Sequence, residues 1–235
     1  MVKHKTSCEE CLNYDCLIKR SCSTEEIEAV EAEKVSLKIR KKQSIIQEGN
    51  ESHSMYFVYS GIIKVFKIGA FNKDQIVRFS VEGNILGHRG FIPENVYPIS
   101  AQAITESQVC LFTKEYFFYL VKNTPKLSIN LVLVFAKELF HEEAKLRDMA
   151  IFNVREKVAK VLLLLIEKFG INENNEIIDI EFLSRQDIAE YVGLTSNQIT
   201  KVLSEFKSDG FIETSGKKIK ILSQEKLEGI VAYLA

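Results

Sequence analysis

Four of the five cysteines in this 235-residue chain lie within its first 22 residues. They follow the pattern Cys8-x2-Cys11-x4-Cys16-x5-Cys22, and the fifth, Cys110, lies alone much further along the chain. Thiolates are soft ligands, and several of them close together can bind an iron–sulfur cluster or a zinc ion. The spacing therefore predicts a metal-binding segment at the N-terminal end, with iron–sulfur and zinc both open at this point.

The composition is typical of a folded, soluble protein. Hydrophobic residues make up 46% and charged residues 27% of the chain, with 3 prolines and 11 glycines. A chain of this length and composition can form two domains of ordinary size, each with a buried hydrophobic core. Apolar runs such as 161–166 are too short to cross a bilayer, and no apolar signal sequence follows Met1. We therefore expect a cytoplasmic protein without membrane contact, in a reducing compartment where clustered cysteines favour metal chemistry over disulfides.

Short alternating runs between about residues 36 and 113 predict a β-sandwich or barrel. The runs, separated by turns that include 71–74, lie at residues 44–47, 55–59, 62–66, 75–79 and 108–112. A capped helix over about 24–32 is expected before them, and a short helix near 113–122 after them.

A long helix is predicted to begin at Thr124-Pro125 and to continue to about Asp148, since proline at the first helical position costs no hydrogen bond. Between Leu127 and Phe140 this helix is apolar on almost every side. A surface helix of a monomer needs only one apolar stripe, so two apolar faces predict two packing partners. We assign one face to the β domain and the other to the same helix of a second subunit. A central core helix of a monomer is the alternative.

The second half of the chain predicts two short helices joined by a tight turn. Ser184 with Asp187, and Thr195 with Gln198, have the spacing of a capping box at the start of each helix. Gly193 can adopt the left-handed conformation that reverses the chain between them. This pattern favours a helix-turn-helix over the alternative, a helical hairpin whose polar face is only solvated.

In a helix-turn-helix the N-terminal end of the second helix enters the major groove of DNA, where hydroxyl, amide and ammonium groups read base edges. A β-hairpin expected over 211–221 supplies lysines for phosphates. The predicted DNA-contacting residues are Ser184, Arg185, Thr195, Ser196, Asn197, Thr200, Lys201, Lys217 and Lys218. Net charge does not support DNA binding, because residues 151–235 hold 11 Lys+Arg against 13 Asp+Glu.

The order of these parts resembles the CRP/FNR family of bacterial transcription regulators over roughly residues 25–225. The segment 55–65 is similar to the β-roll signature of that family, and 183–210 to its helix-turn-helix. The resemblance implies an α+β fold, no enzymatic activity, a homodimer, a palindromic double-stranded DNA operator and RNA polymerase as a partner. The implied domains are a cysteine-rich segment (1–23), a β-roll (24–123), a dimerisation helix (124–150) and a winged helix-turn-helix DNA-binding domain (151–235).

Within the family, the N-terminal cysteines together with Cys110 are most similar to the oxygen-sensing FNR branch. Its members hold an oxygen-labile [4Fe–4S] cluster with three N-terminal cysteines and one at the place of Cys110. The resemblance implies a response to oxygen, nitric oxide or redox state, and the implied ligands are Cys8, Cys11, Cys16 and Cys110.

This chain departs from the FNR pattern in having four residues between Cys11 and Cys16, one fewer than expected. Cys22 is a rival ligand, and it can instead pack as a hydrophobic staple beneath the helix that follows it. The alternative function is a regulator of the same family with a structural zinc, or with no metal, and an unknown small-molecule effector.

Cyclic-nucleotide sites of this family resemble one another in a glutamate that binds the ribose and an arginine that binds the phosphate. His88 stands at the place of that glutamate and Ile99 at the place of that arginine. Burying a phosphate without its cation is costly, so we expect no cyclic nucleotide unless Arg89 substitutes. In the recognition helix Asn197 replaces the usual glutamate and Lys201 the usual arginine, so we expect a different operator.

Overall fold

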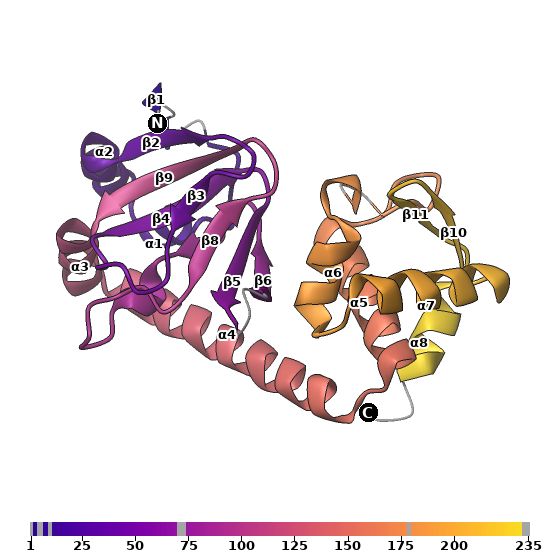
Figure 1. Ribbon diagram of the computed structural model, residues 1–235. Coiled ribbons are helices and arrows are strands. Elements are labelled where there is room, and N and C mark those ends of the chain that lie inside the picture. Colours follow the sequence, from indigo (N-terminus) through magenta and orange to yellow (C-terminus); the bar gives the residue numbers. More distant parts are fainter. Residues whose placement is uncertain (1, 4–6, 9–10, 70–73, 178–179, 232–235) are drawn as a thin grey trace. The chain divides into compact units, whose positions relative to one another are not determined.

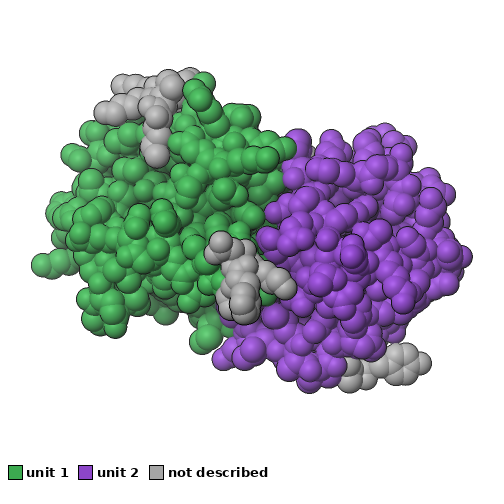
Figure 2. Space-filling view, viewed as in Figure 1, with its two compact units in different colours: residues 1–140 green, residues 141–235 purple. Residues whose placement is uncertain are grey.

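The computed structural model describes residues 2–3, 7–8, 11–69, 74–177 and 180–231 (Figure 1). The chain forms two compact units, residues 1–140 and 141–235 (Figure 2). The turn expected at 71–74 lies largely outside the described residues, as does part of the connection before the helix-turn-helix.

Two antiparallel sheets form the β-roll of the first unit. Among the described residues the first sheet has the order β1-β2-β9-β4-β7 and the second the order β3-β8-β5-β6. The first sheet consists of β1 (Val2–Lys3), β2 (Val35–Ile39), β9 (Ser107–Thr113), β4 (Ser54–Ser60) and β7 (Ile85–Leu86). The second consists of β3 (Ser44–Ile46), β8 (Ser100–Ala103), β5 (Ile63–Ile68) and β6 (Asp74–Ser80). Alternate side chains of both sheets, among them Ile63, Val65 and Val109, form one core.

Helices cover the outer face of the first sheet in unit 1. They are α1 (Leu17–Ser21), α2 (Thr24–Glu33), the short helix η2 (His88–Gly90), α3 (Lys114–Asn123) and the long helix α4 (Pro125–Ile151). A second core forms between them and strands β4 and β9, and it includes Leu17, Val30, Phe57, Phe112 and Leu127. The N-terminal helices are therefore part of the hydrophobic core of the β-roll rather than an appended tail.

The predicted helices agree with this structure. Helix α2 starts at a complete capping box between Ser23 and Glu26, and α3 starts at Thr113, whose hydroxyl accepts the Tyr116 backbone N–H. Helix α4 has Pro125 as its first residue and ends three residues later than predicted. Helix α1 and strand β1 were not predicted, because each is too short for a periodic pattern.

Helix α4 buries one side of its 27 residues and exposes the other. Leu127 and Leu131 are buried in the core of unit 1. The exposed large apolar side chains of α4 are Ile129, Val132, Leu133, Phe135, Leu139, Phe140, Leu146 and Ile151. Despite this apolar surface, none of the helices in the described part of the chain has the length and hydrophobicity to cross a membrane.

The second unit contains the C-terminal end of α4 and a compact helical domain with a small hairpin. Its elements are α5 (Val154–Phe169), η3 (Ile180–Phe182), α6 (Arg185–Val192), α7 (Ser196–Ser208), β10 (Ile212–Ser215), β11 (Lys218–Ile221) and α8 (Gln224–Val231). A capping box between Asn153 and Glu156 starts α5 and so separates it from α4. The fold is α+β, as predicted, and α8 is an addition that the sequence reasoning missed.

The turn between β4 and β5 offers a test of close packing in the β-roll. Gly61 has φ +92°, and a Cβ there would lie 2.3 Å from the Ser107 hydroxyl and 2.7 Å from the Glu106 carbonyl oxygen. Gly49 has φ +84° but open space around it. We expect Gly49→Ala to lower the free energy of unfolding by about 1 kcal/mol and Gly61→Ala by about 2 kcal/mol more. Equal losses in denaturant titrations would contradict this account.

Candidate metal centre and DNA interface

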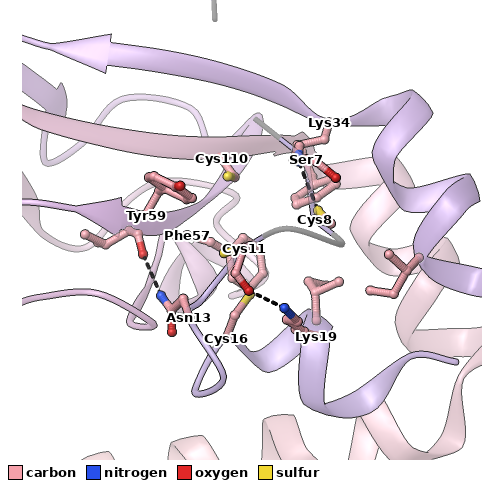
Figure 3. A pocket seen from close by; sticks show the side chains of 14 residues that line it. Ser7, Cys8, Cys11, Asn13, Cys16, Lys19, Lys34, Phe57, Tyr59 and Cys110 are labelled. Carbon is pink, nitrogen blue, oxygen red and sulfur yellow. Dashed lines mark hydrogen bonds between the residues drawn. The ribbon is translucent and has the colours of Figure 1, made fainter. Parts of the chain in front are cut away.

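Four of the five cysteines line one pocket in the first unit, which we call the cysteine pocket. Cys8 and Cys11 come from the N-terminal segment, Cys16 is the N-cap of α1, and Cys110 lies on β9 opposite Phe57 of β4. Figure 3 shows these side chains around the same hollow. The pocket has about 470 Å³ of empty space, part of it open to solvent.

The N-terminal segment is held over this pocket by contacts from three elements. The Asn13 side-chain amide donates to the Val58 carbonyl of β4 at 3.4 Å. The Glu31 carboxylate of α2 accepts the Cys8 backbone N–H at 3.3 Å, and Lys34 at the C-terminal end of α2 donates to the Cys8 sulfur at 3.0 Å. Lys19 of α1 donates to the Cys11 carbonyl. Two lysine ammonium groups therefore lie beside the sulfur-rich hollow.

Burial governs the protonation of the cysteine pocket. It raises the pKa of Cys16 above its ordinary value and that of Cys110 to about 11, although the Lys34 charge opposes the second shift. Both thiols are therefore protonated at neutral pH in the metal-free chain. A metal bound here would have to displace these protons, so its binding would be coupled to pH.

Cys22 lies outside the residues that line the pocket. It follows α1, directly before the Ser23 N-cap of α2, and packs against the same hydrophobic core as Ile27. Burial raises its pKa to about 11 as well. These contacts fit the hydrophobic staple better than the rival-ligand interpretation.

The soft donors around the cysteine pocket are all thiols, which limits the groups that they could hold. In the described residues no three or more His, Cys, Asp or Glu side chains are arranged to hold a single metal ion. A lone zinc ion would draw its sulfurs to about 2.3 Å from the metal, which these side chains do not match as placed. An all-thiol set spread around a larger hollow suits an iron–sulfur cluster, whose iron atoms each take a separate cysteine.

The second unit contains a complete helix-turn-helix. Helices α6 and α7 each begin with a full capping box, at Ser184 with Asp187 and at Thr195 with Gln198. Gly193 ends α6 in the left-handed conformation at φ 70°. The inward side chains of the motif are Ile188, Ala189, Val192, Ile199, Val202, Leu203 and Phe206, all buried. The local geometry thus agrees with the sequence analysis.

The predicted base-reading side chains divide into two groups. Asn197, Thr200 and Lys201 are exposed on the N-terminal half of α7. The hydroxyl groups of Ser184 and Thr195 are engaged in the two caps, where each accepts a backbone N–H. The Thr200 hydroxyl donates to the Ser196 carbonyl at 2.8 Å, so it offers DNA an acceptor. The caps position the motif, and the exposed residues of α7 are the candidates for base contact.

The hairpin β10–β11 lies close to the start of the motif. Arg185 donates to the Gly216 carbonyl in the hairpin turn at 3.5 Å, and this contact joins the turn to α6. Lys217 is exposed beside the turn, whereas Lys218 forms an ion pair with Glu176 at 3.3 Å. The structure therefore favours Lys217 over Lys218 as a phosphate ligand.

One anchor of the recognition helix was missed by the sequence reasoning. The Arg155 guanidinium of α5 forms ion pairs with Glu205 and Asp209 at the C-terminal end of α7, and it lies 4.7 Å from the centre of the Phe206 ring. The pattern held a weak signal, since two carboxylates four residues apart lie on one side of a helix. Glu205 and Asp209 are two of the carboxylates that counted against DNA binding, and both are paired with Arg155.

The positions compared with a cyclic-nucleotide site are occupied by the protein itself. His88 is buried, and its Nε2 lies 2.9 Å from a carboxylate oxygen of Glu138 in α4. Ile99 is buried in the core between the sheets, and the Ser100 hydroxyl accepts the Glu48 backbone N–H at 3.0 Å. The side chains that stand at the ribose and phosphate positions of that site are thus engaged within the fold.

Comparison with known proteins identifies both units. Residues 36–124 match the cyclic nucleotide-binding domain and residues 156–230 the Crp-like helix-turn-helix domain. Transcriptional activator protein Anr of Pseudomonas protegens is 25% identical over 228 residues, which is 95% of this chain and 92% of the relative. The fumarate and nitrate reduction regulatory protein of Vibrio cholerae is 29% identical over 192 residues, 80% of this chain and 75% of the relative.

A solved structure shares the fold along most of the chain. FixK2 from Bradyrhizobium japonicum superimposes with a TM-score of 0.77 at 23% identity, covering 86% of this chain and 99% of that one. The two matched domains stand in the same order as the β-roll and the helix-turn-helix described above. The chain therefore belongs to the CRP/FNR family, whose members are DNA-binding transcription regulators and not enzymes.

Proposed function

We propose that this regulator senses oxygen, nitric oxide or redox state through a [4Fe–4S] cluster held by Cys8, Cys11, Cys16 and Cys110. The observation that carries the proposal is the cysteine pocket, because a cysteine of β9 lies beside three from the N-terminal segment. Similarity to Anr and to the Vibrio cholerae regulator supports the same branch of the family. When bound, such a cluster supplies a redox-active centre that reacts with oxygen and nitric oxide.

The proposed ligands come from two different parts of the first unit. Cys110 belongs to the sheet, whereas Cys8, Cys11 and Cys16 belong to the segment that covers it. Four shared ligands therefore tie the segment to the sheet, and Lys34 and Lys19 offset the negative charge that four thiolates bring. With the thiols protonated and separate, only the hydrogen bonds and apolar contacts of the segment hold it.

The covering segment is joined directly to the start of α4. The side-chain amide of Asn130 in α4 donates to the Ser21 hydroxyl at the end of α1, at 2.9 Å. The Thr124 hydroxyl, directly before α4, donates to the Glu26 carboxylate of α2 at 3.0 Å. A change in how tightly α1 and α2 are held is thereby transmitted to α4.

Helix α4 is the proposed dimerisation helix, and residues 1–23, 24–123 and 151–235 are the proposed sensor segment, β-roll and DNA-binding domain. The exposed apolar face of α4 fits the same face of a second chain. Pairing of α4 sets the separation of the two recognition helices, which must be about 34 Å to enter successive major grooves of a palindromic site. Cytoplasmic location and contact with RNA polymerase complete the proposal.

Protein purified without air is expected to be coloured and to contain iron and sulfide. Each of Cys8→Ser, Cys11→Ser, Cys16→Ser and Cys110→Ser should abolish or greatly reduce both, because each removes one ligand of a four-thiolate site. Cys22→Ser is the matched control and should retain the iron content of the wild type. The measurements are the absorption spectrum and the amounts of iron, sulfide and zinc per chain.

Colourless protein with neither iron nor sulfide would contradict the proposal that the protein senses through an iron–sulfur cluster. Zinc in place of iron, retained in air, would instead show a structural clip. Normal iron in Cys110→Ser with loss in Cys22→Ser would show that the pocket has been assigned the wrong fourth ligand.

Substitutions on the exposed face of α4 are expected to separate the dimer. Leu133→Asp and Leu139→Asp each introduce one charge per subunit, and therefore two charges, into the proposed contact between the helices. We expect the dimer dissociation constant to rise at least about a hundredfold. Leu222→Asp alters an exposed leucine outside α4 and should leave the dimer intact. Sedimentation equilibrium distinguishes these outcomes, and a wild-type chain that is monomeric throughout would refute the role of α4.

Substitutions in the recognition helix and in the hairpin should distinguish contacts with bases from contacts with phosphates. On an operator selected with the wild-type protein, Asn197→Ala and Lys201→Ala should each cost about 1–3 kcal/mol and relax base preference. Lys217→Ala should weaken binding to all sequences alike and reduce its salt dependence. Lys207→Ala, at the other end of α7, is the control. An unchanged base preference in Asn197→Ala would remove that residue from the interface.

A further inference from the structure

A second polar centre lies in unit 1, apart from the cysteine pocket. The Glu138 carboxylate of α4 is surrounded by Arg78 of β6 and by His88 and Arg89 of η2. Its oxygens lie 2.8 Å from an Arg78 guanidinium nitrogen, 2.9 Å from His88 Nε2 and 2.9 Å from Arg89 Nη2. We call Arg78, His88 and Arg89 the cationic basin.

Glu138 interrupts the apolar stripe by which α4 contacts the β-roll. Leu127 and Leu131 of this stripe are buried, and Val134 packs against the same core. The Phe135 ring is 38% exposed, at the edge of the stripe, and lies 5.1 Å from the His88 ring. One turn further on, helical spacing places Glu138 on the same side of α4. The Glu138 side chain is only 18% exposed, so α4 places a charge where an apolar residue would continue the stripe.

The basin is arranged to receive a carboxylate. Arg78 also donates to the Ile85 carbonyl at 3.2 Å and to the Ser80 hydroxyl at 3.4 Å, which fixes its guanidinium. Arg89 donates from Nε as well, at 3.0 Å to the same Glu138 oxygen. The His88 side chain has no exposed surface. Charged partners held in this way give shorter and stronger hydrogen bonds than neutral ones.

The ionisation of the pair agrees with this geometry. Burial tends to raise the pKa of Glu138, but the hydrogen bond from His88 and the charges of Arg78 and Arg89 lower it to about 2. Burial lowers the pKa of His88, so its ring is neutral at pH 7 and donates from Nε2. The contact therefore joins one carboxylate to two guanidinium groups and one neutral donor.

We propose that the cationic basin is a carboxylate-binding site of the β-roll, and that its ligand is Glu138 of the same chain. The basin lies at the position compared above with a cyclic-nucleotide site, through His88 and Arg89. Here the anion is part of α4, so it cannot diffuse away. The site clamps α4 to the β-roll permanently and needs no dissociable effector. This inference is independent of the iron–sulfur proposal and applies to the metal-free chain.

The clamp is tested in the full-length metal-free protein. Glu138→Gln keeps the shape of the side chain and removes its charge, and Glu143→Gln changes an exposed carboxylate of the same helix. We expect amide hydrogens over residues 132–142 to exchange roughly tenfold faster in Glu138→Gln, and no change in Glu143→Gln. Equal exchange in Glu138→Gln and wild type would overturn the clamp.

The site is tested by supplying the missing carboxylate. Glu138→Ala leaves the basin without its ligand, and sodium acetate should raise its thermal midpoint above that in an equal concentration of sodium chloride. Wild type, Glu143→Gln and the double variant Arg78→Gln/Glu138→Ala should show no such difference. An equal response of all four proteins, or no response of Glu138→Ala, would overturn the assignment of a carboxylate site.

Discussion

Helix α4 carries apolar side chains on both faces, and both faces have to be removed from water for the helix to be stable. The first unit covers one face with the β-roll and the core that α1 and α2 complete. The opposite face stays exposed in the single chain, with Val132 and Phe140 among its most accessible side chains. The proposed dimer answers this constraint by covering the exposed face of α4 with the same face of a second chain.

The N-terminal segment acts at the place where it can influence α4 most directly. Helices α1 and α2 share a hydrophobic core with the first two turns of α4, and the Ser21–Asn130 and Glu26–Thr124 hydrogen bonds join them to its start. The cysteine pocket is lined in part by Ile18 and Lys19 of α1 and by Ile27 of α2. A change in its ligation state therefore has only a few packed side chains to cross before it reaches the dimer face.

Local chemistry made much of the fold predictable from the sequence. The capping pairs at Ser184 and Thr195 and the left-handed Gly193 are recognisable within a few residues, so the helix-turn-helix bounds agreed with the structure. Contacts between distant residues were not predictable in this way. Cys110 was placed with the N-terminal cysteines only through family resemblance. Nothing in the pattern around Glu138 indicates its partners, because they lie about fifty to sixty residues earlier and meet it only in the folded chain.

The two proposals assign different roles to two points on one helix. Contacts near Thr124 and Asn130 join α4 to the N-terminal helices, whose attachment is proposed to vary with the cysteine pocket, whereas the contact at Glu138 is made by the cationic basin. From Asn130 to Glu138 the helix advances by about 12 Å, at 1.5 Å per residue. A rigid helix held at one point and released at the other rotates about the held point. Taken together, the two proposals imply that the exposed face changes its direction toward the second subunit without α4 leaving the β-roll.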